Sequence, residues 1–474
     1  ICACLVGSEM CIRDRYIRKK GEEMSEHISN LVESKLKKIK EEKNVFDTGK
    51  VIRLKDYIIE VSGLENVAYY EKVTIRGKGM GYVNEIKENS VIISVVKEDK
   101  PIEIGDTVNT TGERFRAIFA EEALGRVTDL FGVDLLTGRA FEKFKYIDIE
   151  RPTVPIMDRT PVNRPMLTGI AGIDLIYPIG RGQRQLIIGD KKTGKTQIAL
   201  DTIVNQGQIM KEKSNKNDII CIYIAVGKTK KEIKSIYNEL LRRNALSYTM
   251  IVAATNDDKT TVQSLIPYVG LSIAEEYMMQ KKDVVVVIDD LKAHAQSYRE
   301  ISLISNKAPG REAYPADIFF LHSRLLEKGC QHKCGGSITI LPIVETKGGD
   351  ITDYISTNII SITDGQIVLS EKQFKKGQIP AINYGVSVSR LGGAVQTEDM
   401  KKLGSGIRRE LLSYLETKEV YELANMDEMS PELREKMRKG KLIEQALRQN
   451  KFSPLTQDEI KERFKMLGED AKWE

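Results

Sequence analysis

The spacing of apolar residues changes twice along the chain and predicts three structural regions. From about Phe46 to Ala117, short β-rich runs recur about every ten residues between turns, as in a small barrel or sandwich. From about Glu121 to Thr397, apolar strand-like runs alternate with helical stretches, which predicts a mainly parallel sheet. Beyond Glu398 the pattern is charged and helical. We therefore expect the fold class α/β, with a small N-terminal β-barrel domain (46–117), a central domain (118–398) and a C-terminal helical domain (399–474).

An amphipathic helix is predicted ahead of the barrel, at residues 24–45. Ser25 is placed to cap it, and its apolar residues share one face. Such a helix either packs on its own chain or docks on a partner, and we interpret it as a docking helix. Residues 1–23 begin with Ile and contain no signal peptide with a cleavage site, so we expect an artefactual or disordered leader before Met24. The apolar face comprises Ile28, Leu31, Val32, Leu36 and Ile39.

Composition and charge narrow the class of protein. The chain has 474 residues, of which 41% are hydrophobic and 30% charged, as in soluble globular proteins. A net charge of +5 is too small over this length to indicate a nucleic-acid binder. The apolar run Val284–Ile288 is far shorter than the roughly 20 residues of a membrane helix, so membrane association must come through partners. The six cysteines form no disulfide framework, which indicates a reducing compartment.

The stretch "GDKKTGKT" matches the phosphate-binding pattern G-x-x-x-x-G-K-[ST] and lies between a strand pattern and a helix pattern. Its two glycines allow backbone N–H groups to surround phosphate oxygens at the N-terminus of the helix. The lysine of the motif reaches the terminal phosphates, and the hydroxyl that follows can bind Mg²⁺. The predicted nucleotide-binding residues of this loop are Gly189, Asp190, Lys191, Lys192, Thr193, Gly194, Lys195 and Thr196.

A second stretch supports a nucleotide site. Asp283–Asp290, "DVVVVIDD", reads as a buried parallel strand that ends in two carboxylates. Such a strand delivers the residues at its carboxyl end to the ligand crevice. We expect Asp289 to hold the hydration shell of Mg²⁺, so that Thr196 and Asp289 are the predicted metal residues.

From about Val45 to Ser453 the chain resembles the α subunit of F-type ATP synthases. The resemblance rests on long stretches: "PIGRGQRQLIIGDKKTGKTQIALDTI", "PGREAYPADIFFLHSRLLE", "STNIISITDGQIVLS" and "PAINYGVSVSRLGGAVQ". It implies a RecA-like central domain that binds ATP or ADP with Mg²⁺. After "FSPL" the chain is shorter than is usual in the family, so the helical domain is either divergent or truncated.

The resemblance also implies an assembly. Three α and three β chains would form a ring around a rotating γ shaft, with nucleotide at each α/β boundary, and a δ-type stalk subunit would bind the N-terminal helix. The ring would couple ATP synthesis or hydrolysis to ion flow through a membrane sector, on the cytoplasmic face of a bacterial membrane. Nucleic acid is not an expected partner, and the sequence leaves H⁺ or Na⁺ open as the coupled ion.

The residue after Gly227 indicates that this chain does not hydrolyse the nucleotide. Catalytic relatives place Glu directly after a glycine at this strand end, where it positions and polarises water. Here the turn reads "VGKTKKE", with Lys228 in that place. A protonated lysine donates hydrogen bonds and cannot accept a proton from water. Glu232 lies in the following segment and is not expected to substitute.

Other positions depart from the family pattern. In the family, Gln is usual at the positions of Lys192 and Lys228. With lysine at both positions, four ammonium groups lie in this region. Either all four surround the triphosphate, or two of them point into solvent. Near the expected adenine pocket, Ile379 stands where Arg is usual, while Phe374 and Gln449 remain candidates for contacts with the base. The departures on the base side are Ile379 and Lys451; the four ammonium groups belong to Lys191, Lys192, Lys195 and Lys228.

Arg390 is the predicted catalytic residue, acting on a partner subunit. It ends the strand-like run "AINYGVSVSR" just before "LGG", an arrangement that presents a side chain at a subunit edge. The resemblance implies that it crosses the α/β boundary as an arginine finger. A guanidinium there can stabilise the charge that spreads over the γ-phosphoryl oxygens in the transition state.

Two alternatives remain from the sequence. One is a self-sufficient hexameric ATPase such as an export motor, against which Lys228 argues. The other is a ring-shaped RNA translocase of the termination-factor type, since a small barrel before such a core also describes that class. The barrel region offers no basic and aromatic stacking platform of the kind that single-strand binders use.

Overall fold

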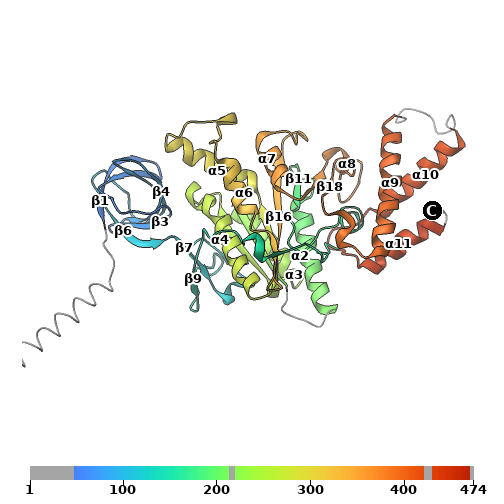
Figure 1. Cartoon of the computed structure of the whole chain (residues 1–474), viewed down its shortest axis with the longest axis horizontal. Helices are drawn as coiled ribbons and strands as arrows, with labels where there is room; N and C mark the ends of the chain where they lie inside the picture. The colour runs from blue at the N-terminus through green and yellow to red at the C-terminus, as the bar shows by residue number, and fades with distance from the viewer. Residues whose placement is uncertain (1–46, 213–218, 421–429, 470–474) are drawn as a thin grey trace, which may run out of the picture.

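The computed structural model describes residues 47–212, 219–420 and 430–469. Figure 1 shows a β-barrel at one end, a sheet flanked by helices in the middle and a group of helices at the other end. The predicted fold class is confirmed, with the three regions in the expected order. The helix predicted at 24–45 and the leader at 1–23 lie outside the described residues.

Six strands close the N-terminal barrel in the order β1-β2-β5-β4-β3-β6. Strand β1 pairs with both β2 and β6, so the closed barrel leaves no free sheet edge. Alternate residues point inward, as in β3, where Val73 and Ile75 are buried beside exposed or half-buried neighbours. The strands are β1 (Thr48–Lys55), β2 (Ile58–Ser62), β3 (Glu71–Ile75), β4 (Gly79–Ile86), β5 (Val91–Glu98) and β6 (Thr107–Arg114).

A largely parallel sheet forms the centre of the molecule. Its path runs β18-β17-β11-β16-β14-β12-β13-β8, and only the β18–β17 pair along it is antiparallel. The carboxyl ends of the parallel strands therefore meet at one edge of the sheet, where ligands bind in such folds. The strands are β8 (Val127–Thr128), β11 (Leu186–Asp190), β12 (Ile219–Lys228), β13 (Thr249–Thr255), β14 (Asp283–Asp289), β16 (Ser337–Thr346), β17 (Gly365–Leu369) and β18 (Val388–Ser389).

Both faces of this sheet are buried, which explains the continuous apolar runs in the sequence. In β12, Ile222 and Ile224 belong to one apolar cluster, while Cys221 and Tyr223 belong to the other. Helices α4 to α7 cover the first face, and α2, α3 and the C-terminal helices contribute to the second cluster. The helices are α2 (Lys195–Glu212), α3 (Lys230–Arg242), α4 (Thr260–Met279), α5 (Leu291–Ile304), α6 (Ile318–Leu326) and α7 (Tyr354–Ile362).

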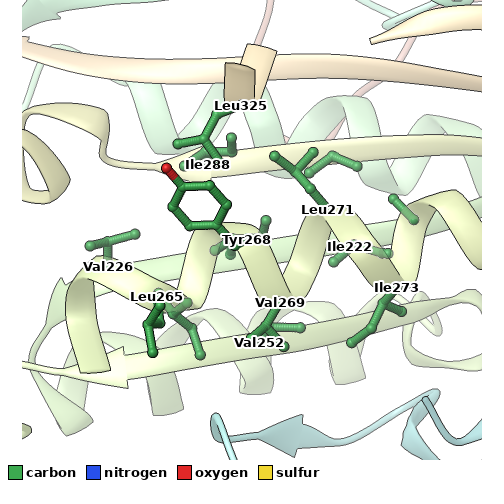
Figure 2. Packing of buried hydrophobic residues seen from close by; sticks show 14 of the residues in the cluster. Ile222, Val226, Val252, Leu265, Tyr268, Val269, Leu271, Ile273, Ile288 and Leu325 are labelled. Carbon is green, nitrogen blue, oxygen red and sulfur yellow. The ribbon is translucent and has the colours of Figure 1, made fainter. Parts of the chain in front are cut away.

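Helix α4 lies at the centre of the first cluster. Figure 2 shows Tyr268 and Leu271 of this helix among Ile222 of β12, Ile288 of β14 and Leu325 of α6. All five side chains are almost completely buried. The packing of α4 therefore holds the middle strands in place from one side.

The C-terminal helices pack closely on the central domain and on each other. A Cβ atom at Gly404 would lie 2.3 Å from the backbone oxygen of Leu175, so α9 approaches that segment as only glycine allows. A Cβ atom at Gly440 of α10 would lie 2.0 Å from the ring of Tyr414. The C-terminal helices are α9 (Glu398–Val420), α10 (Pro431–Ala446) and α11 (Gln457–Glu469).

In the described part of the chain, no helix is long and apolar enough to cross a membrane.

The central packing yields a prediction on stability. Leu271 is 0% exposed, and replacing it with Ala should lower the free energy of unfolding of the central domain by about 2–5 kcal/mol, because the deletion leaves a cavity. Leu241, which is 52% exposed on α3, provides the control, and Leu241→Ala should cost less than about 1 kcal/mol. Urea unfolding followed by circular dichroism measures both. Equal effects would contradict the packing described for α4.

Candidate functional site

The predicted phosphate loop joins β11 to α2 and follows the geometry that the motif requires. Gly194 has a φ of +100° and Lys192 a φ of +64°, so the backbone turns sharply before the first residues of α2. The loop thus leads into the N-terminus of an 18-residue helix, where free backbone N–H groups and the helix dipole favour anions.

The two glycines of the motif serve different purposes. Gly194 needs glycine for its positive φ, as expected for a loop that wraps around phosphate. At Gly189 the reason is packing, because a Cβ atom would lie 2.5 Å from the backbone oxygen of Leu369 on β17. Gly189 therefore lets two strands approach, and its predicted place in the phosphate site stays a prediction.

Hydrogen bonds within the chain brace the loop. The Thr193 hydroxyl and the Lys195 ammonium both donate to the backbone oxygen of Asp190, at 2.7 and 2.6 Å. The Asp190 carboxylate accepts hydrogen bonds from Thr346 and from the N–H of Gly349, so it anchors the loop to the segment after β16. Asp190 thus supports the loop through one oxygen of its carboxylate.

The four lysines expected near the phosphates fall into two groups. Lys195 is buried, and this burial lowers the pKa of its ammonium group. Lys228 is half-buried at the end of β12. Lys191 and Lys192 are exposed on the loop, which agrees with the alternative that two of the four lysines face solvent.

Asp289 is the centre of the polar cluster at the carboxyl edge of the sheet. It is 1% exposed, and its Oδ2 atom accepts hydrogen bonds from the Thr196 hydroxyl at 2.9 Å and the Tyr223 hydroxyl at 2.5 Å. The start of α2 and the middle of β12 therefore meet at the carboxylate that ends β14. The structure brings the predicted metal residues Thr196 and Asp289 together.

Lys228 forms an ion pair with the same carboxylate. Its Nζ atom lies 2.7 Å from Oδ1 of Asp289 and 3.7 Å from Oδ2 of Asp290. Burial disfavours the ammonium, but the two carboxylates outweigh it and hold the pKa of Lys228 above its usual value. Lys228 therefore stays protonated at neutral pH and has no capacity to act as a base.

Two of the nearby carboxylates are engaged in structural contacts. Glu232 forms a capping box with Thr229 at the start of α3, and these hydrogen bonds hold the pKa of Glu232 below its usual value. Asp290 accepts the N–H of Ala293 as the cap of α5, and its burial raises the pKa of its carboxyl group despite the nearby Lys228. Neither carboxylate stands in the position after Gly227.

Thr196 and Asp289 carry the type of donor atom that Mg²⁺ prefers, but the negative charge available to the ion is partly neutralised. The Thr196 hydroxyl and the Asp289 carboxylate are oxygen donors of the kind that Mg²⁺ prefers. The ammonium of Lys228 already balances the charge of that carboxylate. The assignment of Thr196 and Asp289 to Mg²⁺ stays a prediction.

A mainly apolar pocket of about 460 Å³ adjoins the loop at Thr193 and Gly194. This volume suits a small ligand, and the lining includes Phe374 and Ile379 from the segment after β17. The pocket thus provides room for a base beside the phosphate loop, and Phe374 can form one of its walls. The other lining residues are Ile170, Gln197, Ile198, Asp201, Pro380, Ala381, Gln449, Asn450 and Lys451.

Gln449 lines this pocket but is held by the protein itself. Its Nε2 atom donates to the backbone oxygens of Gly169 and Ser453 at 2.6 and 2.7 Å, and its Oε1 atom accepts the N–H of Ala171 at 3.0 Å. Both amide hydrogens are therefore used, and one acceptor position of Oε1 remains. Gln449 joins the C-terminal region to the central domain, and its predicted contact with a base is limited to that position.

Arg390 lies apart from the loop and the pocket. It follows β18, the edge strand of the sheet, and its side chain is exposed. Its N–H donates to the backbone oxygen of Asp364, while its guanidinium makes no hydrogen bond or ion pair with the residues that the structure describes. An exposed guanidinium at a sheet edge is available to a neighbouring molecule.

Sequence reasoning missed Tyr223, which completes the environment of Asp289. Burial, together with its contact with Asp289, raises the pKa of the Tyr223 phenol far above its ordinary value. A signal was present in the sequence, because a tyrosine inside the apolar strand "IICIYIAV" must bury a hydroxyl that needs a partner. The identity of that partner is visible only in the folded chain.

The chain is similar to known proteins over most of its length. The family model described as "ATP synthase alpha/beta family, nucleotide-binding domain" matches residues 169–389, which include the loop, β12, β14 and β18. The ATP synthase subunit alpha of Macrococcus caseolyticus is 40% identical over 437 residues, which cover 92% of this chain and 85% of that protein. The subunit alpha of Acetivibrio thermocellus is 42% identical over 423 residues, 88% of this chain and 81% of that protein.

A third relative is the "ATP synthase subunit alpha, sodium ion specific" of Acetobacterium woodii. It is 39% identical over 431 residues, which cover 91% of this chain and 84% of that protein. The similarity therefore extends well beyond the phosphate loop.

The cluster around Asp289 yields a prediction on stability. Tyr223→Phe should lower the free energy of unfolding by about 1.5–3 kcal/mol, because it removes a hydrogen bond to a buried carboxylate. Tyr268→Phe is the matched control, since the buried Tyr268 hydroxyl has no hydrogen-bond partner among the described residues. That variant should be neutral or stabilising. Urea unfolding of the two variants compares them, and equal losses would contradict the role of the Tyr223 hydroxyl.

Proposed function

Because the chain belongs to the family of ATP synthase alpha subunits, we propose that it binds ATP or ADP without hydrolysing it and assists the reaction of a neighbouring subunit. The observation that carries the proposal is the place of Lys228, at the end of β12 beside Asp289. Hydrolysis needs a group that positions water and accepts its proton. An ammonium that pairs with Asp289 cannot accept a proton, which favours binding without turnover.

The nucleotide would extend from the loop into the adjoining pocket. Backbone N–H groups of Gly189–Thr196 and the ammonium of Lys195 would bind the phosphates, at the positive end of α2. The base would occupy the pocket beside Phe374 and Ile379. If Mg²⁺ accompanies the nucleotide, Thr196 and Asp289 are the residues that would hold it, beside the ammonium that already pairs with Asp289, and it would supply positive charge to the phosphate oxygens.

The proposed assembly follows from the family. The chain would alternate with β subunits in a ring around a γ shaft and bind a δ-type subunit through residues 24–45. It would lie on the cytoplasmic face of a bacterial membrane, attached through other subunits that couple the ring to H⁺ or Na⁺ flow. The match of about nine-tenths of this chain to alpha subunits supports this proposal over an export motor or an RNA translocase.

Arg390 is proposed to act on the nucleotide of the adjacent β subunit. Its support is the exposed guanidinium after the edge strand β18, away from the chain's own pocket. A planar guanidinium can contact two phosphoryl oxygens at once and stabilise the transition state. The chain would thus bind one nucleotide and assist the hydrolysis or synthesis of another.

The first test concerns the chain alone. The purified full chain should bind ATP and show almost no steady-state hydrolysis, and Lys195→Ala should weaken binding at least about tenfold because a charge-assisted contact is lost. Lys211→Ala, at the exposed far end of the same helix, is the control and should bind as the parent chain does. Calorimetry measures binding and a phosphate-release assay measures turnover. Robust hydrolysis by the partner-free chain would overturn the proposal.

The second test concerns Arg390 in the assembled complex. Arg390→Ala should leave nucleotide affinity within about tenfold but lower multisite turnover by about 10² or more, because transition-state charge loses its partner. Arg390→Lys should rescue little, since a point charge cannot form the planar two-point contact. Arg242→Ala, which removes a surface arginine from α3, is the control. Near-native turnover of a normally assembled Arg390→Ala complex would show the assignment to be wrong.

A further inference from the structure

The position of Lys228 also bears on whether the nucleotide needs Mg²⁺. This inference rests on the proposed nucleotide site. We propose that the Lys228 ammonium takes the place of the divalent cation at Asp289, so that this chain binds ATP or ADP equally well without Mg²⁺. The side chain would act as a built-in counter-ion between the carboxylates and the phosphates.

The contacts of Asp289 leave little room for a metal ion. Oδ2 already accepts two hydroxyl hydrogen bonds, from Thr196 and Tyr223, and Oδ1 faces the ammonium of Lys228 at 2.7 Å. A carboxylate has about four acceptor positions, and three of them are filled by the chain itself. The hydroxyl of Thr196 donates its one hydrogen to this carboxylate, while its oxygen lone pairs can still accept.

The charges of the cluster are balanced in part by the chain. Asp289 and Asp290 would repel a nucleotide that carries no metal ion, and Lys228 offsets this repulsion from 2.7 and 3.7 Å. Its side chain is only 20% exposed, so its field is weakly screened by solvent. A divalent ion that approached Asp289 would meet this ammonium as a like charge. The position therefore favours a phosphate oxygen over a metal ion.

The chemistry of an ammonium suits the bridging role. Lys228 has three N–H donors, and the pair with Asp289 uses one of them. The remaining donors can reach toward phosphate oxygens. Lys195 donates to the backbone oxygen of Asp190 instead of to Asp289, so it does not bridge that carboxylate to the phosphates.

The test measures ATP binding to the full chain by calorimetry, once with excess Mg²⁺ and once with EDTA. The parent chain should give two dissociation constants within about threefold of each other. Lys228→Gln removes the charge while keeping a similar length, and it should bind ATP at least about tenfold more weakly in EDTA than in Mg²⁺. Lys228→Arg keeps the charge and should retain most of the independence from Mg²⁺.

Lys230→Gln is the matched control, because Lys230 lies two residues away, is 73% exposed and pairs with Asp257 at the surface. It should leave the ratio of the two constants unchanged. Parent-chain binding that needs Mg²⁺ would overturn this inference and leave the proposed nucleotide site intact. Absence of ATP binding in both conditions would overturn the proposed function as well. The parent chain decides between these outcomes even if Lys228→Gln fails to fold.

Discussion

The burial of one carboxylate organises the functional end of this molecule. Asp289 is 1% exposed, and a buried ionised carboxylate is costly unless hydrogen bonds and an opposite charge surround it. Thr196, Tyr223 and Lys228 provide these partners from three places in the chain. To satisfy Asp289, the start of α2 and the end of β12 must lie beside the end of β14. The geometry of the phosphate loop and the place of Lys228 both follow from this requirement.

The sheet explains why the polar cluster forms where it does. Apolar clusters cover both faces of the central strands, so polar side chains find room only where the strands end. Parallel pairing collects the carboxyl ends of β11, β12, β14 and β16 at one edge. The pocket beside the loop is completed by distant segments around Phe374 and Gln449. Gln449 joins the C-terminal region to the central domain through hydrogen bonds. Binding of a nucleotide at this edge would therefore depend on how the C-terminal helices pack.

The proposed division between binding and catalysis has a simple chemical basis. The position after Gly227 decides whether the strand end offers a base or a cation, and in this chain it offers a cation. Arg390 is exposed after the edge strand β18 and separate from the residues that line the chain's own pocket. One subunit can thus keep a nucleotide in place while its charged edge serves another subunit.

The sequence by itself determined the order of the three regions, the phosphate loop and the absence of a base after Gly227. These features depend on short stretches, because apolar periodicity, glycine conformations and residue chemistry act over a few neighbouring residues. Only the tertiary structure decided that Gly189 serves strand packing, that Tyr223 and Lys228 share Asp289, and that Gln449 is committed to backbone groups. Each of these contacts joins residues that are dozens to hundreds of positions apart. Their partners are selected by burial and strand order, which no local pattern contains.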